Sequence, residues 1–158
     1  MALLSIQPYN YRKVDDTLSR SAQPDERNIV WLKSQGVTDI VNLRTMYDPQ
    51  INFDEKELVE LNGMIYHNIP SHTRCPKPEN VGEFLDIVEG VKQSGGKVHV
   101  HCKQGADRTG MYTYIYERVN KVKPKKEAKK EFVECGWHSD LYPDLDKIAE
   151  KFVKMFKK

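Results

Sequence analysis

The residues best suited to chemistry lie in one stretch, residues 97–110, which reads KVHVHCKQGADRTG. Val98 and Val100 alternate with two histidines, a period-two pattern that predicts a short buried strand. Cys102 follows this strand, and the loop after it contains Gly105 and leads into a segment suited to begin a helix. A tight loop at a helix N-terminus directs backbone N–H groups and partial positive charge toward one point. The stretch therefore predicts an anion site with a thiol beside it.

Cys102 is the predicted nucleophile of this site, with Arg108 and Thr109 beside it. A free thiol has a pKa of about 8.5, and a helix N-terminus with a nearby guanidinium lowers it to roughly 3.5–7.5. The resulting thiolate can attack phosphorus and form a phosphocysteine that water later hydrolyses. Arg108 can bind two phosphate oxygens at once, and the Thr109 hydroxyl can donate a hydrogen bond to the sulfur. We expect the His101 ring to hold the loop from behind.

The stretch resembles the signature loop of the cysteine-dependent phosphatases, the protein tyrosine phosphatase superfamily, in which His-Cys is followed by five residues, Arg, and Ser or Thr. The matching positions are His101, Cys102, Gly105, Arg108, Thr109 and Gly110. The resemblance implies a phosphate-binding loop, to which we assign Lys103, Gln104, Gly105, Ala106 and Gly110. A buried cysteine with an unrelated arginine nearby is the alternative.

The chain from residue 10 onward also resembles the small atypical dual-specificity phosphatases. These include the plant-and-fungal type that acts on inositol pyrophosphates, and they are related to the tyrosine-phosphatase-like phytases. In that setting Asn42 and Arg44 lie behind the signature loop as support. Ordinary strand-end residues are the alternative interpretation of both.

The order of apolar patterns predicts an α/β fold. Strand-like segments lie at residues 10–24, 37–44, 64–70 and 98–101, and helical segments at residues 25–36, 53–63, 81–96, 111–119, 125–137 and 144–156. Helices alternate with strands up to the signature loop, which favours a mainly parallel sheet flanked by helices. The signature loop would then join a central strand to a helix, at the carboxyl ends of the strands. We expect a single domain over residues 1–158, with residues 1–8 as a short lead.

Composition sets broad limits on the class of protein. The chain has 158 residues, 39% hydrophobic and 30% charged, with a net charge of +2, as in a soluble globular protein with no evident need for nucleic acid. No apolar run is long enough to span a bilayer, and the first ten residues do not form a signal peptide. The widely spaced Cys75, Cys102 and Cys135 favour a reducing compartment without disulfides, zinc or another cofactor. We expect a cytoplasmic protein, or a secreted one if a signal peptide has been removed.

The proton donor for the leaving oxygen departs from the superfamily pattern. In the wider superfamily an Asp on a mobile loop supplies the proton, whereas the corresponding residues 70–76 contain no carboxylate. Asp107 occupies the place used by the myotubularin-type phosphoinositide phosphatases, whose loop also ends in D-R-T, and it is our first candidate. A loop-stabilising carboxylate paired with a basic neighbour is its alternative. His72 is the second candidate for the proton donor, with an ordinary surface histidine as the alternative interpretation. Glu79 is the third candidate.

Positive charge around the loop bears on the substrate. Lys103 and Gln104 can project toward the mouth of the site, and a Lys at that position resembles phosphoinositide phosphatases that act on crowded phosphates. Arg74 and Lys77, with His72, add positive charge from an upstream loop. A substrate with several phosphates gains from each such contact. Plain solvent exposure is the alternative for each of these cations.

We therefore expect a metal-free phosphomonoesterase that acts on a phosphorylated small molecule, with inositol polyphosphates such as phytate as the leading class. The first alternative is a phosphotyrosine or dual-specificity phosphatase with a phosphoprotein substrate, which needs a partly aromatic slot for which Tyr9 and Tyr11 are candidates. A non-catalytic binder of phosphorylated ligands is an alternative of another class. Cys75 is either a passive thiol or a reversible disulfide partner of Cys102 under oxidation.

Overall fold

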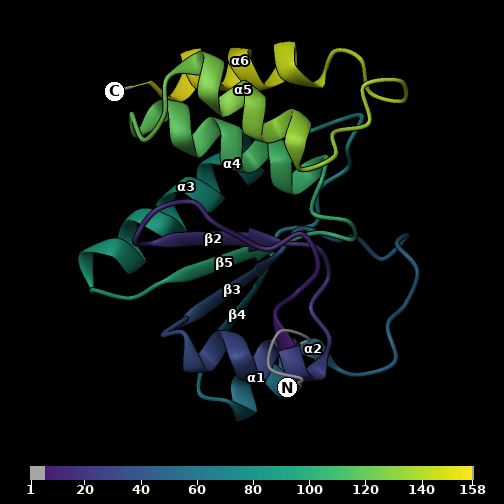
Figure 1. Ribbon diagram of the computed structural model, residues 1–158, viewed down its shortest axis with the longest axis vertical. Helices are drawn as coiled ribbons and strands as arrows, with labels where there is room; N and C mark the ends of the chain where they lie inside the picture. Colours follow the sequence, from purple (N-terminus) through teal and green to yellow (C-terminus); the bar gives the residue numbers. More distant parts are fainter. Residues whose placement is uncertain (1–5, 158) are drawn as a thin grey trace.

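The computed structural model describes residues 6–157, which form a five-stranded sheet with helices on both faces (Figure 1). The strands are β1 (Arg12–Lys13), β2 (Leu18–Ser21), β3 (Asp39–Asn42), β4 (Ile65–Asn68) and β5 (Val98–His101), in the spatial order β1-β2-β5-β3-β4. Strands β2 to β5 run parallel, and β1 pairs antiparallel with β2. The predicted α/β fold is confirmed, with β5 at the centre of the sheet. Residues 1–5 of the expected lead lie outside the described residues.

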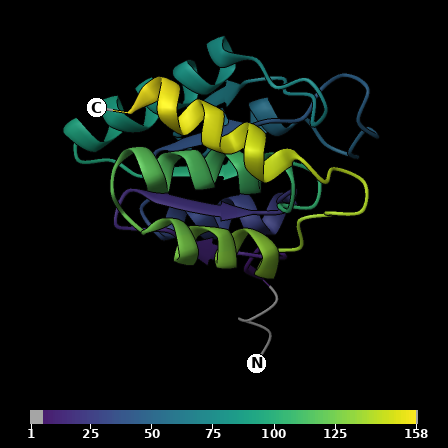
Figure 2. The same ribbon diagram turned by 90° about the horizontal axis from the view of Figure 1, so that it is seen from above.

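The helices divide between the two faces of the sheet. One face carries α1 (Glu26–Ser34) and α2 (Glu55–Leu61), and the other carries α3 (Pro78–Gln93), α4 (Arg108–Val119), α5 (Lys125–Glu134) and α6 (Leu145–Phe156) (Figures 1 and 2). No helix within residues 6–157 has both the length and the apolar character needed to cross a bilayer. The same residues contain no group of His, Cys, Asp and Glu side chains that could hold a metal ion.

Local side-chain hydrogen bonds explain the start of α1 and one difference from expectation. Asp25 caps α1 through its side chain, which accepts from the Asn28 N–H at 2.8 Å, as acidic and amide residues before a helix commonly do. The segment predicted as one strand over residues 10–24 is instead a hairpin of β1 and β2. The Asp15 carboxylate accepts from the N–H groups of Thr17 and Leu18, both at 2.8 Å, and this side-chain turn reverses the chain.

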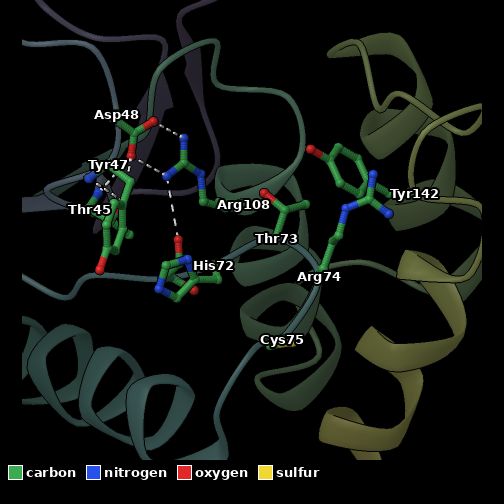
Figure 3. Close-up of a pocket in the computed structure, with 10 residues that line it drawn as sticks. Thr45, Tyr47, Asp48, His72, Thr73, Arg74, Cys75, Arg108 and Tyr142 are labelled. Carbon is green, nitrogen blue, oxygen red and sulfur yellow. Dashed lines mark hydrogen bonds and ion pairs between the residues drawn. The ribbon is translucent and has the colours of Figure 1, made fainter.

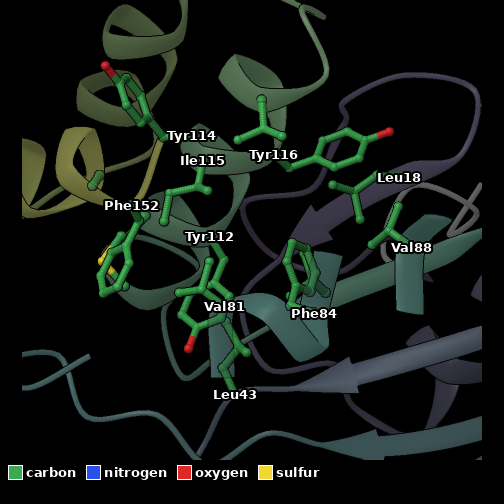
Figure 4. Close-up of a cluster of buried hydrophobic side chains, with 14 of the residues drawn as sticks. Leu18, Leu43, Val81, Phe84, Val88, Tyr112, Tyr114, Ile115, Tyr116 and Phe152 are labelled. Atoms are coloured by element: carbon green, nitrogen blue, oxygen red, sulfur yellow. The ribbon is translucent and has the colours of Figure 1, made fainter. Parts of the chain in front are cut away.

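The larger hydrophobic core lies between the sheet and helices α3 to α6 (Figure 4). Helix α4 crosses this core and is buried almost throughout, because it contacts β2, α3, α5 and α6. Its side chains include Ile115 and Tyr112, and the Tyr112 ring packs edge-on against Phe84 of α3. A second, smaller core lies under α1 and α2. A helix enclosed in this way has little freedom to shift, so its N-terminus is a fixed point next to the carboxyl end of β5.

Candidate active site

The predicted nucleophile lies between the central strand and the central helix. Cys102 directly follows β5, and Arg108 begins α4. Cys102 is only 2% exposed, and its Sγ accepts a hydrogen bond from the backbone N–H of Gly105 at 3.3 Å. The loop therefore directs a backbone N–H toward the sulfur at a helix N-terminus, which is the environment that stabilises a thiolate.

Two glycines let this loop and helix approach their neighbours closely. Gly105 has a φ of +74°, and a Cβ there would lie 2.6 Å from the backbone N of Ala22. A Cβ on Gly110 would lie 2.7 Å from a ring carbon of Phe132. Backbone atoms cannot move aside as a flexible side chain can, so Gly105 is required by both its conformation and its surroundings.

The back of the signature loop is held by a chain of buried polar groups. His101 Nε2 lies 2.6 Å from a Glu55 carboxylate oxygen, and Gln23 donates to the other oxygen at 2.7 Å. Burial raises the pKa of the Glu55 carboxyl, but attraction to His101 and the hydrogen bonds of His101 and Gln23 outweigh it, so the pKa is lowered. The backbone N–H of Gln23 also donates to the Lys103 carbonyl at 3.0 Å. The structure thus places His101 behind the loop.

Arg20 supports the loop from the neighbouring strand β2. Its Nη2 donates to the Gly105 carbonyl at 2.8 Å, and its Nη1 lies 3.5 Å from a Glu131 carboxylate oxygen of α5. Arg20 is fully buried. A buried guanidinium is stable only with such partners, so this contact fixes the loop to both β2 and α5. Sequence patterns did not indicate a role for Gln23 or Glu55 in the site.

Asn42 and Arg44 lie at the carboxyl end of β3, beside the site. The Asn42 side chain accepts from the Arg44 N–H at 2.9 Å and donates to the Tyr66 hydroxyl at 3.0 Å. Arg44 donates to Gln23 at 3.0 Å and also to the Pro49 carbonyl. Arg44 therefore joins the support behind the signature loop to the loop between β3 and α2.

The guanidinium of Arg108 is already paired with a carboxylate. Its two terminal nitrogens donate to the two oxygens of Asp48, each at 2.8 Å, and Nη1 also lies 3.4 Å from the Ser71 carbonyl (Figure 3). Both side chains are only 12% exposed. The hydrogen bond from Arg108 is the main reason that the pKa of Asp48 lies well below its usual range. Asp48 was not among the predicted site residues.

Asp107 has hydrogen-bond partners for both carboxylate oxygens, whereas the Thr109 hydroxyl has none among the described residues. One carboxylate oxygen of Asp107 accepts from the His138 N–H, and the other lies beside His138 Nδ1, both at 2.8 Å. This is the arrangement of a carboxylate that ties a neighbouring loop to the signature loop. The Thr109 hydroxyl is buried and has no hydrogen-bond partner within residues 6–157. The expected bond from Thr109 to the Cys102 sulfur is therefore not formed in this geometry.

Two adjoining cavities open onto the signature loop. The inner one, of about 310 Å³, is bordered by Cys102, Lys103, Gln104, Asp107 and Arg108. The outer one, of about 480 Å³, is bordered by His72, Arg74 and Cys75. Tyr47, Asp48, Thr73, Arg108 and Tyr142 border both.

The outer cavity combines cationic and aromatic side chains. The Arg74 guanidinium lies over the Tyr142 ring, 5.0 Å from its centre, while Lys77 lies outside both cavities at the start of α3 (Figure 3). Cys75 is exposed and unpaired. Tyr11 stacks on His99 and borders neither cavity, so the aromatic groups at the mouth come from other segments than expected.

Comparison with known proteins decides the family. Residues 5–140 match the model of the DSP-PTPase phosphatases fused to NAD+ kinase. The chain belongs to this family. It is therefore a member of the protein tyrosine phosphatase superfamily, and the resemblance drawn from the signature loop is confirmed.

Individual relatives match this chain over only part of their length. It is 35% identical over 96 residues to mouse dual specificity protein phosphatase CDC14B, an alignment that covers 58% of this chain and 17% of that protein. It is 27% identical over 132 residues to inositol diphosphatase DSP2 of Oryza sativa subsp. japonica, covering 76% and 59%. The chain thus spans less than two thirds of the length of either relative.

Solved structures share the fold of this chain. TpbA of P. aeruginosa superposes with a TM-score of 0.72 at 23% identity, covering 93% of this chain and 84% of that one. The core catalytic domain of the PP-IP phosphatase SIW14 from S. cerevisiae superposes with a TM-score of 0.73 at 18% identity, covering 96% and 87%. At these identities the likeness shows the fold.

Proposed function

We propose that this protein, acting as one catalytic domain, hydrolyses phosphomonoesters through a phosphocysteine formed on Cys102. The observation that carries the proposal is the Cys102 sulfur held at the N-terminus of α4, with the Gly105 N–H directed at it and Arg108 beside the same opening. The thiolate attacks phosphorus while the bond to the leaving oxygen breaks, and loop N–H groups and Arg108 hold the other phosphate oxygens. The unpartnered Thr109 hydroxyl is free to stabilise the sulfur as it leaves.

Inositol polyphosphates such as phytate are the proposed substrate class. Lys103 and Gln104 on the inner cavity, and His72 and Arg74 on the outer one, are placed to contact phosphates remote from the one attacked. Each charge-assisted contact strengthens binding of a multiply phosphorylated ring. The likeness to the rice inositol diphosphatase supports this class. Lys77 borders neither cavity.

A phosphotyrosine or dual-specificity protein phosphatase is the second candidate function, favoured by one specific observation. Tyr47 and Tyr142 border both cavities and could flank the ring of a phosphotyrosine. The likeness to the mouse dual specificity phosphatase supports this alternative. A non-catalytic binder of phosphorylated ligands is the remaining alternative.

A comparison of phosphate release from three substrates tests these proposals. Inositol hexakisphosphate, a phosphotyrosine peptide and a small aryl phosphate are supplied separately over a series of salt concentrations. We expect turnover of all three, with the highest kcat/KM for the inositol compound and a preference that weakens as salt screens the exposed cations. A higher kcat/KM for the peptide, or a ratio independent of salt, would support the protein phosphatase instead. Binding of phosphate without turnover of even the aryl ester would identify a binder.

A further inference from the structure

The pairing of Asp48 with Arg108 has a direct consequence for substrate binding. A carboxylate and a phosphate present similar pairs of oxygen acceptors to a guanidinium. Asp48 occupies both terminal nitrogens of Arg108, at 2.8 Å each. A phosphate that is to bind Arg108 through the same nitrogens must therefore displace Asp48, and the displaced carboxylate stays at the opening because Asp48 borders both cavities.

We propose that the phosphate of the substrate displaces Asp48 from Arg108, and that Asp48 then protonates the leaving oxygen. This inference rests on the proposed phosphatase function and names the proton donor that residues 70–76 lack. Asp48 would act from the loop between β3 and α2, whereas the sequence-based candidate Asp107 belongs to the signature loop; both border the inner cavity.

The charges around Asp48 explain how displacement creates an acid. In the unliganded protein the Arg108 hydrogen bonds, the Thr45 N–H and the nearby Arg44 favour the ionised carboxylate. A phosphate dianion bound to Arg108 neutralises the main favourable partner and adds negative charge next to Asp48, which raises the pKa of its carboxyl. Besides Asp48 and Arg108, the titratable side chains that border the outer cavity are Tyr47, His72, Arg74, Cys75 and Tyr142. The carboxyl can then take a proton from solvent.

The proton and bonds balance over the two steps. As the Cys102 sulfur bonds to phosphorus and the ester oxygen leaves, protonated Asp48 gives its proton to that oxygen, so the alcohol departs neutral. Asp48 is then a carboxylate. When water attacks the phosphocysteine, Asp48 accepts one of its protons while the phosphorus–sulfur bond breaks, which releases phosphate and restores the thiolate and the protonated acid.

The other candidates are less well placed for this role. Both oxygens of Asp107 are engaged by His138, so its release would also detach the loop between α5 and α6. His72 is exposed and packs against Tyr47, with ring centres 6.0 Å apart. Asp48 lies on the loop between β3 and α2, where its neighbour Tyr47 is 81% exposed.

Asp48→Asn keeps the shape of the side chain but removes its charge and its acidic proton. This variant tests both proposed roles of Asp48, as the competitor of phosphate for Arg108 and as the proton donor. We expect inorganic phosphate to inhibit this variant roughly tenfold more strongly, because a charge-assisted competitor for Arg108 is lost. We expect kcat for an alkyl phosphate to fall about 100-fold or more, and kcat for an aryl phosphate with a good leaving group to fall less than about tenfold. Asp107→Asn is the matched control and should show neither the tighter phosphate binding nor this discrimination.

Phosphate binding is also measured on Cys102→Ser with and without Asp48→Asn, which needs no turnover. Unchanged phosphate affinity, together with equal losses on alkyl and aryl esters, would show that Asp48 only shapes its loop and would overturn the proposal. Discrimination in Asp107→Asn but not in Asp48→Asn would assign the acid to Asp107. A protein that binds phosphate but never turns over the aryl ester would refute the proposed phosphatase function separately. Thermal unfolding of each variant checks that the fold is retained.

Discussion

The signature loop and the loops that border its opening are built in opposite ways. The signature loop is fixed by buried contacts, from Arg20 to the Gly105 carbonyl and from Glu55 to the adjacent His101. We call the bordering segments, residues 45–53 and 72–77, the rim loops. They are largely exposed, as Tyr47 and Arg74 illustrate.

This difference separates the chemistry from the choice of substrate. Attack by a thiolate requires positions accurate to a fraction of an ångström, and the buried hydrogen bonds behind the signature loop provide that accuracy. Recognition of distant phosphates or a tyrosine ring requires only suitable charges and surfaces at the mouth. A substitution in the buried part of the signature loop should therefore affect all substrates. A substitution of an exposed side chain at the mouth, such as Arg74 on a rim loop or Lys103 on the signature loop, should affect some substrates and not others.

The largest effect is expected from the nucleophile. Cys102→Ser should lower turnover of every phosphate ester by about 10⁴-fold or more, because a serine hydroxyl at its ordinary pKa is a poor nucleophile here. Phosphate affinity should remain, since Arg108 and the loop N–H groups are unchanged. Initial rates and phosphate binding by calorimetry measure the two quantities. Retention of even a tenth of the wild-type rate would contradict a covalent role for Cys102.

A smaller but general effect is expected from the glycine that shapes the loop. Gly105→Ala should lower kcat on all substrates by about 100-fold, because its positive φ and the Ala22 backbone force the loop to shift. Gly90→Ala in α3 is the matched control, since a Cβ there meets nothing within 4 Å. It should leave activity unchanged and stabilise the protein by about 0.5–1 kcal/mol. Equal activity in the two variants would show that the loop tolerates rearrangement.

The smallest and most selective effect is expected at the mouth. Arg74→Gln or Lys103→Gln should lower kcat/KM for inositol hexakisphosphate by about tenfold each, if each contact is worth about 1.5 kcal/mol. The aryl phosphate should be used almost as before, because it has no second phosphate. Measurement of both substrates in low salt checks this. A similar loss on both would mean that these residues act on the signature loop and not on the remote phosphates.

Sequence alone could predict features that depend on near neighbours. Cys102 and Arg108 are six positions apart, and the strand and helix on either side have clear patterns. The supporting residues come from distant segments: Glu55 is 46 positions from His101, Asp48 is 60 from Arg108, and Arg20 is 85 from Gly105. Residue spacing and apolar periodicity do not identify the partner of a polar residue in a distant segment, so these patterns could not predict the contacts.

The order of strands in the sheet partly indicates the position of Asp48. In a parallel sheet the loops after neighbouring strands meet at one edge, and β3 pairs with β5. The loop after β3 was therefore bound to face the signature loop, and Asp48 is an acidic residue within it. The hairpin of β1 and β2 was missed for a different reason, since it depends on one side-chain turn at Asp15.

The most direct test of the account is chemical trapping of the intermediate. Wild-type protein is mixed with an aryl phosphate that has a good leaving group, quenched in acid within milliseconds, and digested for mass spectrometry. The account predicts one phosphoryl group on the peptide that contains Cys102, appearing in a burst with the released phenol. A phosphoryl group on any other residue, or steady turnover by Cys102→Ser without such a burst, would contradict it.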